Sequence, residues 1–254
     1  MKITFLGTGT SQGIPVIGCD CPVCTSGNRK DNRLRTSVWI ETANTSIVID
    51  SGPDFRYQML RARVNWLDAV LFTHPHKDHV AGLDDIRAYN FFSGKDIPVY
   101  ANEMTQAVLI REFPYAFADT RYPGVPEIAL QTINDEPFYI GDIPVVPVEV
   151  WHMKMPVLGF RIGDFTYITD ANRIEEVEKE KIKGSRILVL NALRKEKHLS
   201  HFTLQEAVDM VNELQIPEAY LTHVSHQLGK HATVNAELPK HIRLAYDGLV
   251  INCS

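Results

Sequence analysis

The feature that most constrains this chain is the run His74-Pro75-His76-Lys77-Asp78-His79. It directly follows residues 69–73, an apolar segment that predicts a buried strand. Alternate side chains of an extended backbone lie on one side, so His74 and His76 can reach one metal ion. A turn after them lets Asp78 and His79 reach a second ion nearby. Polar groups are costly at the end of a buried strand, so the run predicts a metal site and not a polar turn with incidental histidines.

Three further candidates each follow a predicted strand, namely His152, Asp170 and His223. A single histidine or aspartate in such a place is usually a cap or a loop residue. Here the three accompany a cluster of four ligands, which favours a shared site. Imidazole suits zinc, and mixed histidine and carboxylate ligands also accept manganese or iron.

Short β-branched and aromatic segments alternate with helical ones, which predicts an α/β protein. Strands are predicted over residues 2–7, 36–42, 46–50, 69–73, 98–101, 128–133, 144–151, 157–162, 165–169, 187–191, 219–222 and 243–246. Helices are predicted over residues 54–63, 83–91, 103–112, 174–181, 204–214 and roughly 233–239. Thr203 followed by Glu206 is typical of a capping box. No internal repeat or interdomain linker is evident, so the chain of 254 residues fits one large domain.

The order His-x-His-x-Asp-His, then His152, Asp170 and His223, resembles the metallo-β-lactamase fold superfamily over nearly the whole chain. The resemblance implies a four-layer αββα sandwich that forms one metallo-hydrolase domain over residues 1–254. It also implies two divalent ions, Zn²⁺ or Mn²⁺. One ion would be held by His74, His76 and His152, the other by Asp78, His79 and His223, with Asp170 bridging both. The zinc β-lactamases themselves are expected to use a cysteine where Asp170 stands, so the aspartate resembles the branches that cleave phosphodiesters and thioesters.

A second cluster comprises Cys19, Cys21 and Cys24. In a reducing compartment such crowding favours metal binding over a disulfide. Three thiolates need a fourth ligand for a closed zinc site, and His226 could supply it. A Cys-x-Cys-x2-Cys motif near the N-terminus with a His-x2-His motif toward the C-terminus resembles the pattern of the PhnP-like branch. The members of this branch are the phosphoribosyl 1,2-cyclic phosphate phosphodiesterases. The resemblance implies a structural Zn²⁺ in a cysteine-rich loop at about residues 18–28; the alternative is three unligated loop cysteines.

The PhnP-like branch also places a catalytic histidine near residues 198–201. His201 has the spacing to the downstream histidines that this catalytic histidine is expected to have. His198 is then expected at the surface, although the two roles could be reversed. His231 and His241 have no evident partner and are expected at the surface.

Two segments could meet a phosphate. The glycine-rich residues 7–15 resemble the opening of phosphodiesterase and ribonuclease Z-type members, and the loop either presents backbone N–H groups to a phosphate or simply packs near the site. Arg33 and Arg35 either meet phosphate or are solvated.

Together these residues predict a metal-dependent hydrolase that cleaves a small cyclic phosphodiester, such as 5-phosphoribosyl 1,2-cyclic phosphate, with a hydroxide shared by two metals. Asp78 would help to orient the nucleophile, and His201 would act on the leaving group. The alternatives are a ribonuclease Z-like nuclease, a thioesterase or lactonase, and a PqqB-like carrier without enzymatic activity. All seven ligand positions are filled, which favours an enzyme over the carrier.

The net charge of −5 argues against broad nucleic-acid affinity. It is compatible with a small phosphorylated substrate, because bound divalent ions reverse the local field. The chain has no apolar run of about 18 residues, so no membrane span is predicted. We therefore expect a soluble cytoplasmic protein, with a homodimer as one option.

Overall fold

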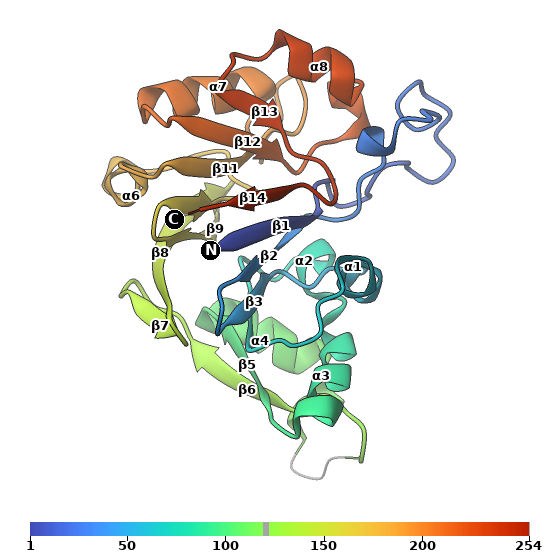
Figure 1. Cartoon of the computed structure of the whole chain (residues 1–254), viewed down its shortest axis with the longest axis vertical. Coiled ribbons are helices and arrows are strands. Elements are labelled where there is room, and N and C mark those ends of the chain that lie inside the picture. The colour runs from blue at the N-terminus through green and yellow to red at the C-terminus, as the bar shows by residue number, and fades with distance from the viewer. Residues whose placement is uncertain (119–121, 254) are drawn as a thin grey trace.

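Two seven-stranded sheets pack face to face, and helices cover the outer face of each (Figure 1). The structure is a computed structural model that describes residues 1–118 and 122–253. This arrangement confirms the predicted four-layer αββα sandwich.

The first sheet has the strand order β14-β1-β2-β3-β4-β5-β6. Its strands from β3 to β6 are parallel, and those from β14 to β3 are antiparallel. Their bounds are β1 (Lys2–Gly7), β2 (Ser37–Glu41), β3 (Ser46–Ile49), β4 (Ala69–Leu71), β5 (Ile97–Ala101), β6 (Ile128–Thr132) and β14 (Val250–Asn252). The helices that follow these strands are α1 (Phe55–Ala62), α2 (Lys77–Val80), η2 (Leu83–Ile86), α3 (Arg87–Ser93), α4 (Glu103–Glu112) and α5 (Pro114–Phe117).

The second sheet has the strand order β13-β12-β11-β10-β9-β8-β7. Strands β10 to β13 are parallel, and β7 to β10 are antiparallel. Their bounds are β7 (Phe138–Ile140), β8 (Ile143–His152), β9 (Met155–Ile162), β10 (Phe165–Tyr167), β11 (Ile187–Asn191), β12 (Glu218–Thr222) and β13 (Ile242–Leu244). The associated helices are α6 (Glu176–Ile182), α7 (Leu204–Glu213) and α8 (His231–Glu237); the 3₁₀ turns η1 (Arg29–Asp31) and η3 (His226–Leu228) lie in loops.

Strand alternation divides the buried side chains between three apolar layers. In β2, Val38 and Ile40 join the core between the sheets, whereas Trp39 between them joins the core under the helices of the first sheet. Successive side chains of a strand point to opposite faces, so a strand buried on both faces contributes to two cores. The layer between the sheets contains large, fully buried rings such as Phe5 and Phe160.

All twelve predicted strands and six predicted helices are present, with ends shifted by a few residues. The prediction missed β7 and β14, which have three residues each, and the four-residue helices α2 and α5. Elements this short contain too few repeats of apolar and polar residues for a strand or helix pattern to be recognised. Within the described residues, no helix is both long and apolar enough to cross a membrane.

Replacing a ring of the central core tests this packing. Phe5→Ala should lower the free energy of unfolding by about 3–5 kcal/mol, because a fully buried ring leaves a cavity that its neighbours fill only in part. Urea unfolding followed by circular dichroism measures the change. Val177→Ala, at a side chain on α6 that is 68% exposed, is the control and should change it by less than about 0.5 kcal/mol. Equal effects of the two substitutions would contradict this description of the core.

Candidate metal centre

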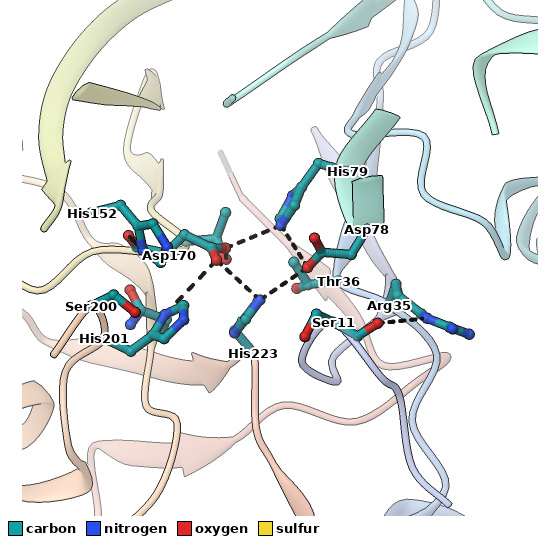
Figure 2. A network of polar contacts seen from close by, with 12 residues as sticks. Ser11, Arg35, Thr36, Asp78, His79, His152, Asp170, Ser200, His201 and His223 are labelled. Carbon is teal, nitrogen blue, oxygen red and sulfur yellow. Dashed lines mark hydrogen bonds and ion pairs between the residues drawn. The ribbon is translucent and has the colours of Figure 1, made fainter. Parts of the chain in front are cut away.

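The predicted ligands meet at one edge of the two sheets. β8, β10 and β12 run in the same direction, so His152, Asp170 and His223 stand together at their carboxyl ends. The first sheet contributes the run that begins at His74, just beyond β4. Figure 2 shows His79 and Asp78 facing Asp170 and His223 across the gap between the two sheets.

Asp170 lies at the middle of the cluster. Its Oδ1 is 3.2 Å from His223 Nε2, and its Oδ2 is 3.3 Å from His79 Nε2 (Figure 2). Asp78 Oδ2 lies 3.2 Å from His79 Nε2 and 3.6 Å from His223 Nε2. Ligands bound at about 2.0–2.2 Å to one ion are separated by roughly 3.0–3.6 Å. These four side chains are therefore spaced as the ligands of one cation.

The remaining predicted ligands, His74, His76 and His152, lie close to one another and to Asp170. The ring centroids of His74 and His76 are 4.6 Å apart, and those of His76 and His152 are 5.2 Å apart. His74 Nε2 is 4.0 Å from Asp170 Oδ1. His76 is the N-cap of α2, and the turn expected after it is the first turn of that helix, which carries Asp78 and His79.

Several buried nitrogens of the cluster lack hydrogen-bond partners among the residues that the structure describes. They are His74 Nε2, His79 Nε2, His201 Nδ1 and both ring nitrogens of His223. Buried polar atoms are nearly always paired, and an ion binding site is among the usual reasons for an exception. The nitrogen and carboxylate donors suit Zn²⁺ or Mn²⁺. The residues therefore fit divalent cations.

The charges of the cluster favour cation binding as well. Burial opposes ionisation of Asp170, but His223 and His79 hold the pKa of its carboxyl well below the usual range. Burial also opposes protonation of His79, yet Asp78 and Asp170 raise its pKa well above the usual value. Burial lowers the pKa of His74, so that ring is neutral. Because an imidazole must lose its extra proton before it binds a metal, metal binding by His79 is coupled to release of a proton.

A residue that the sequence reasoning missed, Asp50, orients the ligands from behind. Its carboxylate lies 2.7 Å from His79 Nδ1 and accepts hydrogen bonds from the backbone N–H and the hydroxyl of Thr73. Thr73 Oγ1 lies 2.9 Å from His74 Nδ1, and the backbone oxygen of Asp170 lies 3.0 Å from His152 Nδ1. These contacts direct Nε2 of each ring to the metal site, a common outer-shell arrangement.

The sequence did contain a signal for Asp50. It follows β3 as Asp170 follows β10, and both sit at strand ends on the same edge of the molecule. Asp50, Asp170 and His223 also share a left-handed backbone, with φ of 65°, 57° and 54°. Non-glycine residues in this region cluster at functional sites.

His201 stands beside the metal ligands. It is buried, its Nδ1 lies 3.8 Å from Asp170 Oδ1, and its ring centroid is 4.6 Å from that of His152. Burial and the neighbouring His223 lower the pKa of His201 to about 3. His198, expected at the surface, is half-buried, with its ring centroid 5.2 Å from that of His201 and its Nδ1 near the Ser200 hydroxyl.

The cysteine cluster converges on His226. The Sγ atoms of Cys19, Cys21 and Cys24 lie 3.3, 3.4 and 3.6 Å from His226 Nδ1. In a tetrahedral zinc site with Zn–S of about 2.3 Å and Zn–N of about 2.0 Å, this separation is about 3.5 Å. The four residues thus fit one zinc ion. His226 follows the predicted metal ligand His223 by three residues, so the N-terminal loop is adjacent to the metal centre.

The glycine-rich loop is bonded to the rest of the protein through several of its backbone N–H groups. The N–H groups of Gly9, Thr10 and Ile14 donate to backbone oxygens of Leu34, Val224 and Arg33. These bonds favour the packing interpretation over a phosphate cradle, and they attach the loop to the segment after His223.

Arg33 is neither solvated nor open to a phosphate. Its guanidinium is buried and donates to Thr8 Oγ1 and the backbone oxygen of Ala245, with His231 Nδ1 at 3.1 Å. The expectation that His231 lies at the surface is therefore wrong, because its ring is the buried partner of Arg33. Arg35 remains half-buried and pairs with Asp54.

Comparison with known proteins places these features in a family. A model described as β-lactamase superfamily domain matches residues 45–224. The crystal structure of a new diphosphatase from the PhnP family superposes with a TM-score of 0.93 and 38% identity, covering 100% of this chain and 98% of that one. Zn²⁺-bound PqqB from Methylobacterium extorquens shares the fold, with a TM-score of 0.77, 19% identity and full coverage of both chains.

A longer relative has a different name. The octanoyltransferase of Porphyromonas gingivalis is 41% identical over 98% of this chain, but the match covers 51% of that protein. This chain thus spans about half the length of that relative.

Asp50→Asn tests the outer-shell contact. An amide N–H directed at His79 Nδ1 would leave the ring proton on Nε2, the nitrogen that faces the metal site. The affinity of this site for Mn²⁺ or Zn²⁺ should fall about 10–100-fold, as measured by metal titration of the folded protein. Asp142→Asn, at an exposed aspartate between β7 and β8 whose carboxylate accepts a hydrogen bond from the Thr42 hydroxyl, should leave the affinity unchanged. An unchanged affinity in Asp50→Asn would rule out this role.

Cys21→Ser tests the second site. It should remove about one zinc ion per chain, because a serine hydroxyl is a poor substitute for a thiolate. Metal at the His223 site should also be held more weakly, since that ligand lies three residues from His226. Elemental analysis after dialysis measures both effects, and Cys253→Ser is the matched control, at a buried cysteine outside the cluster. A full zinc content in Cys21→Ser would contradict the assignment.

Proposed function

This chain belongs to the metallo-β-lactamase superfamily and, within it, to the PhnP-like branch, and we propose that it is a dinuclear metal-dependent phosphodiesterase. Its substrate would be a small cyclic phosphodiester such as 5-phosphoribosyl 1,2-cyclic phosphate. The observation that carries the proposal is Asp170, an ionised carboxylate that contacts His79 and His223 of one predicted ligand set and lies 4.0 Å from His74 of the other. A cysteine in place of Asp170 would instead resemble the zinc β-lactamases.

The bound cations would supply an activated water molecule and neutralise charge on the phosphate oxygens. The chain's own residues would perform the remaining tasks. Asp78 and Asp170 are fixed before substrate arrives and can accept hydrogen bonds from the attacking water. Such preorganised groups need no rearrangement during the reaction, which is why they lower its barrier.

His201 would act on the phosphate. With its pKa lowered to about 3 by burial and His223, the ring is neutral near pH 7. A neutral imidazole can donate one hydrogen bond to a phosphoryl oxygen. To protonate the departing oxygen, His201 would first have to take up a proton from solvent, which the negative charge of a bound phosphate favours.

A diphosphate is the second candidate substrate. The solved structure with 38% identity is a diphosphatase, and it matches this chain over its whole length. Cleavage of a phosphoanhydride would use the same residues, with a phosphate in place of an alkoxide as the leaving group. A substrate panel distinguishes the two candidates.

Other activities have less support. A nuclease acting on transfer RNA needs a basic surface, and the chain carries a net charge of −5. The name of the P. gingivalis relative refers to a protein about twice as long as the matched region, so we do not transfer octanoyl transfer to this chain. A thioester and lactone panel would test the remaining hydrolase alternative, and a carrier would hydrolyse none of these compounds.

The proposal predicts hydrolysis by protein loaded with Mn²⁺ or Zn²⁺. Bis(p-nitrophenyl) phosphate and a cyclic ribose phosphate should be cleaved and phosphomonoesters spared, as followed by absorbance and phosphorus NMR. Faster cleavage of a diphosphate would favour the second candidate. If the loaded protein left all of these phosphates intact, the phosphodiesterase proposal would be wrong.

His201→Ala separates catalysis from metal binding. It should lower kcat by about 10²–10⁴-fold with the metal content unchanged, because a general acid contributes about that factor. His241→Ala, at a histidine before β13 and thus at the opposite edge of the second sheet from His223, is the control and should keep full activity. Loss of metal together with activity in His201→Ala would instead make His201 a ligand.

A further inference from the structure

The two residues that follow Asp170 are held by strands of the second sheet. The backbone N–H of Ala171 donates to Asn191 Oδ1 at 2.7 Å, and the backbone oxygen of Ala171 accepts a hydrogen bond from Asn191 Nδ2 at 2.9 Å. The backbone N–H of Asn172 donates to the backbone oxygen of Trp151 at 2.8 Å. Asn191 is buried at the end of β11, and Trp151 lies in β8. The backbone of Asn172 therefore has a fixed place beside the metal centre.

The side chain of Asn172 contacts two neighbouring loops. Its Oδ1 accepts a hydrogen bond from the backbone N–H of Met153 at 3.0 Å, and its Nδ2 donates to the backbone oxygen of Leu199 at 2.9 Å. Met153 directly follows the predicted ligand His152 and has a left-handed backbone, with φ of 58°. A non-glycine residue keeps such a conformation only where its surroundings hold it. The Leu199 side chain is 76% exposed, so packing does not replace the second contact.

The loop that carries His201 depends on the contact at Leu199. Within the described part of the chain, the backbone of residues 198–201 forms no other hydrogen bond to a residue outside that stretch. Just after His201, the backbone N–H of Phe202 donates to the backbone oxygen of Ala171 at 2.8 Å. His201 thus lies between two attachments, and both lead to the pair of residues that follows Asp170.

We propose that Asn172 is a positioning residue that, through Leu199, holds His201 against the substrate beside Asp170. The inference rests on the proposed function, in which His201 protonates the departing oxygen. A displacement of about 1 Å can cost about 10²-fold in rate, so the loss of this contact should impair proton transfer. No hydrogen bond of the described structure joins the Asn172 side chain to a predicted metal ligand. Metal binding should therefore survive its replacement.

Asn172→Asp tests the contact to Leu199. The carboxylate can still accept the Met153 N–H, but it has no proton to donate to the Leu199 oxygen. The kcat on a cyclic ribose phosphate, whose leaving group is an alkoxide, should fall about 10²-fold with KM and metal content unchanged. The kcat on bis(p-nitrophenyl) phosphate should fall less than about threefold, because p-nitrophenolate leaves without a proton. Asn172→Ala should show the same selective loss, which separates the lost contact from the added charge.

Two further variants complete this comparison. Adding His201→Ala to Asn172→Asp should cause no loss beyond that of His201→Ala alone, because both changes remove the same step. Asn212→Asp, at an exposed asparagine on α7, is the control and should keep full activity on both substrates. An equal loss on the two substrates in Asn172→Asp would make Asn172 a general structural residue and overturn the proposal.

Hydrogen exchange of the metal-loaded protein, followed by mass spectrometry, tests the positioning without a substrate. The peptide over residues 194–202 should exchange at least about tenfold faster in Asn172→Asp than in the wild type, because the loop loses an attachment. An unchanged rate would overturn the proposal even in an active enzyme. If the wild type cleaved no phosphodiester, the proposed function would fail, and faster exchange would still support the role of Asn172 in ordering this loop.

Discussion

The rest of the site depends on the contact between the Asp170 carboxylate and histidines from both halves of the sandwich. His223 and Asp170 follow strands of the second sheet, whereas His79 and His74 follow a strand of the first. Bringing an ionised carboxylate and several imidazoles together away from water is costly unless their charges are compensated. The cations for which these residues are spaced would supply that compensation and join the two sheets at their shared edge.

Threonines in front of the ligands keep this arrangement in place. Thr73, Thr169 and Thr222 each immediately precede a predicted ligand. Thr73 Oγ1 contacts His74 and Asp50, Thr169 Oγ1 donates to Asp170 Oδ2 at 2.7 Å, and Thr222 Oγ1 lies 3.0 Å from Thr36 Oγ1. The hydroxyls of Thr73 and Thr169 contact the ligand that follows them, whereas that of Thr222 joins the end of β12 to the residue before β2. The geometry is thus built into the strands and does not wait for a substrate.

The features of the fold and the site that depend on local pattern and spacing could be predicted from the sequence. The strand before His74 was recognisable because it is apolar throughout, and the cysteine cluster because three thiols occur within six residues. Asp50 follows a strand as the ligands do, but its role depends on contacts with Thr73 and His79 beyond the neighbouring strand β4, which no local pattern reveals. Arg33 and His231 were misplaced for the same reason: they are 198 residues apart in the chain, and only the fold makes each the buried partner of the other.

The central claim is that one edge of the sandwich holds two cations around Asp170 and that the cysteine loop holds a third. Anomalous X-ray diffraction from crystals of protein loaded with Zn²⁺ tests it most directly. Two peaks roughly 3.5–4 Å apart should flank the Asp170 carboxylate, and one more should lie among Cys19, Cys21, Cys24 and His226. A single peak at Asp170, or none, would contradict a dinuclear centre.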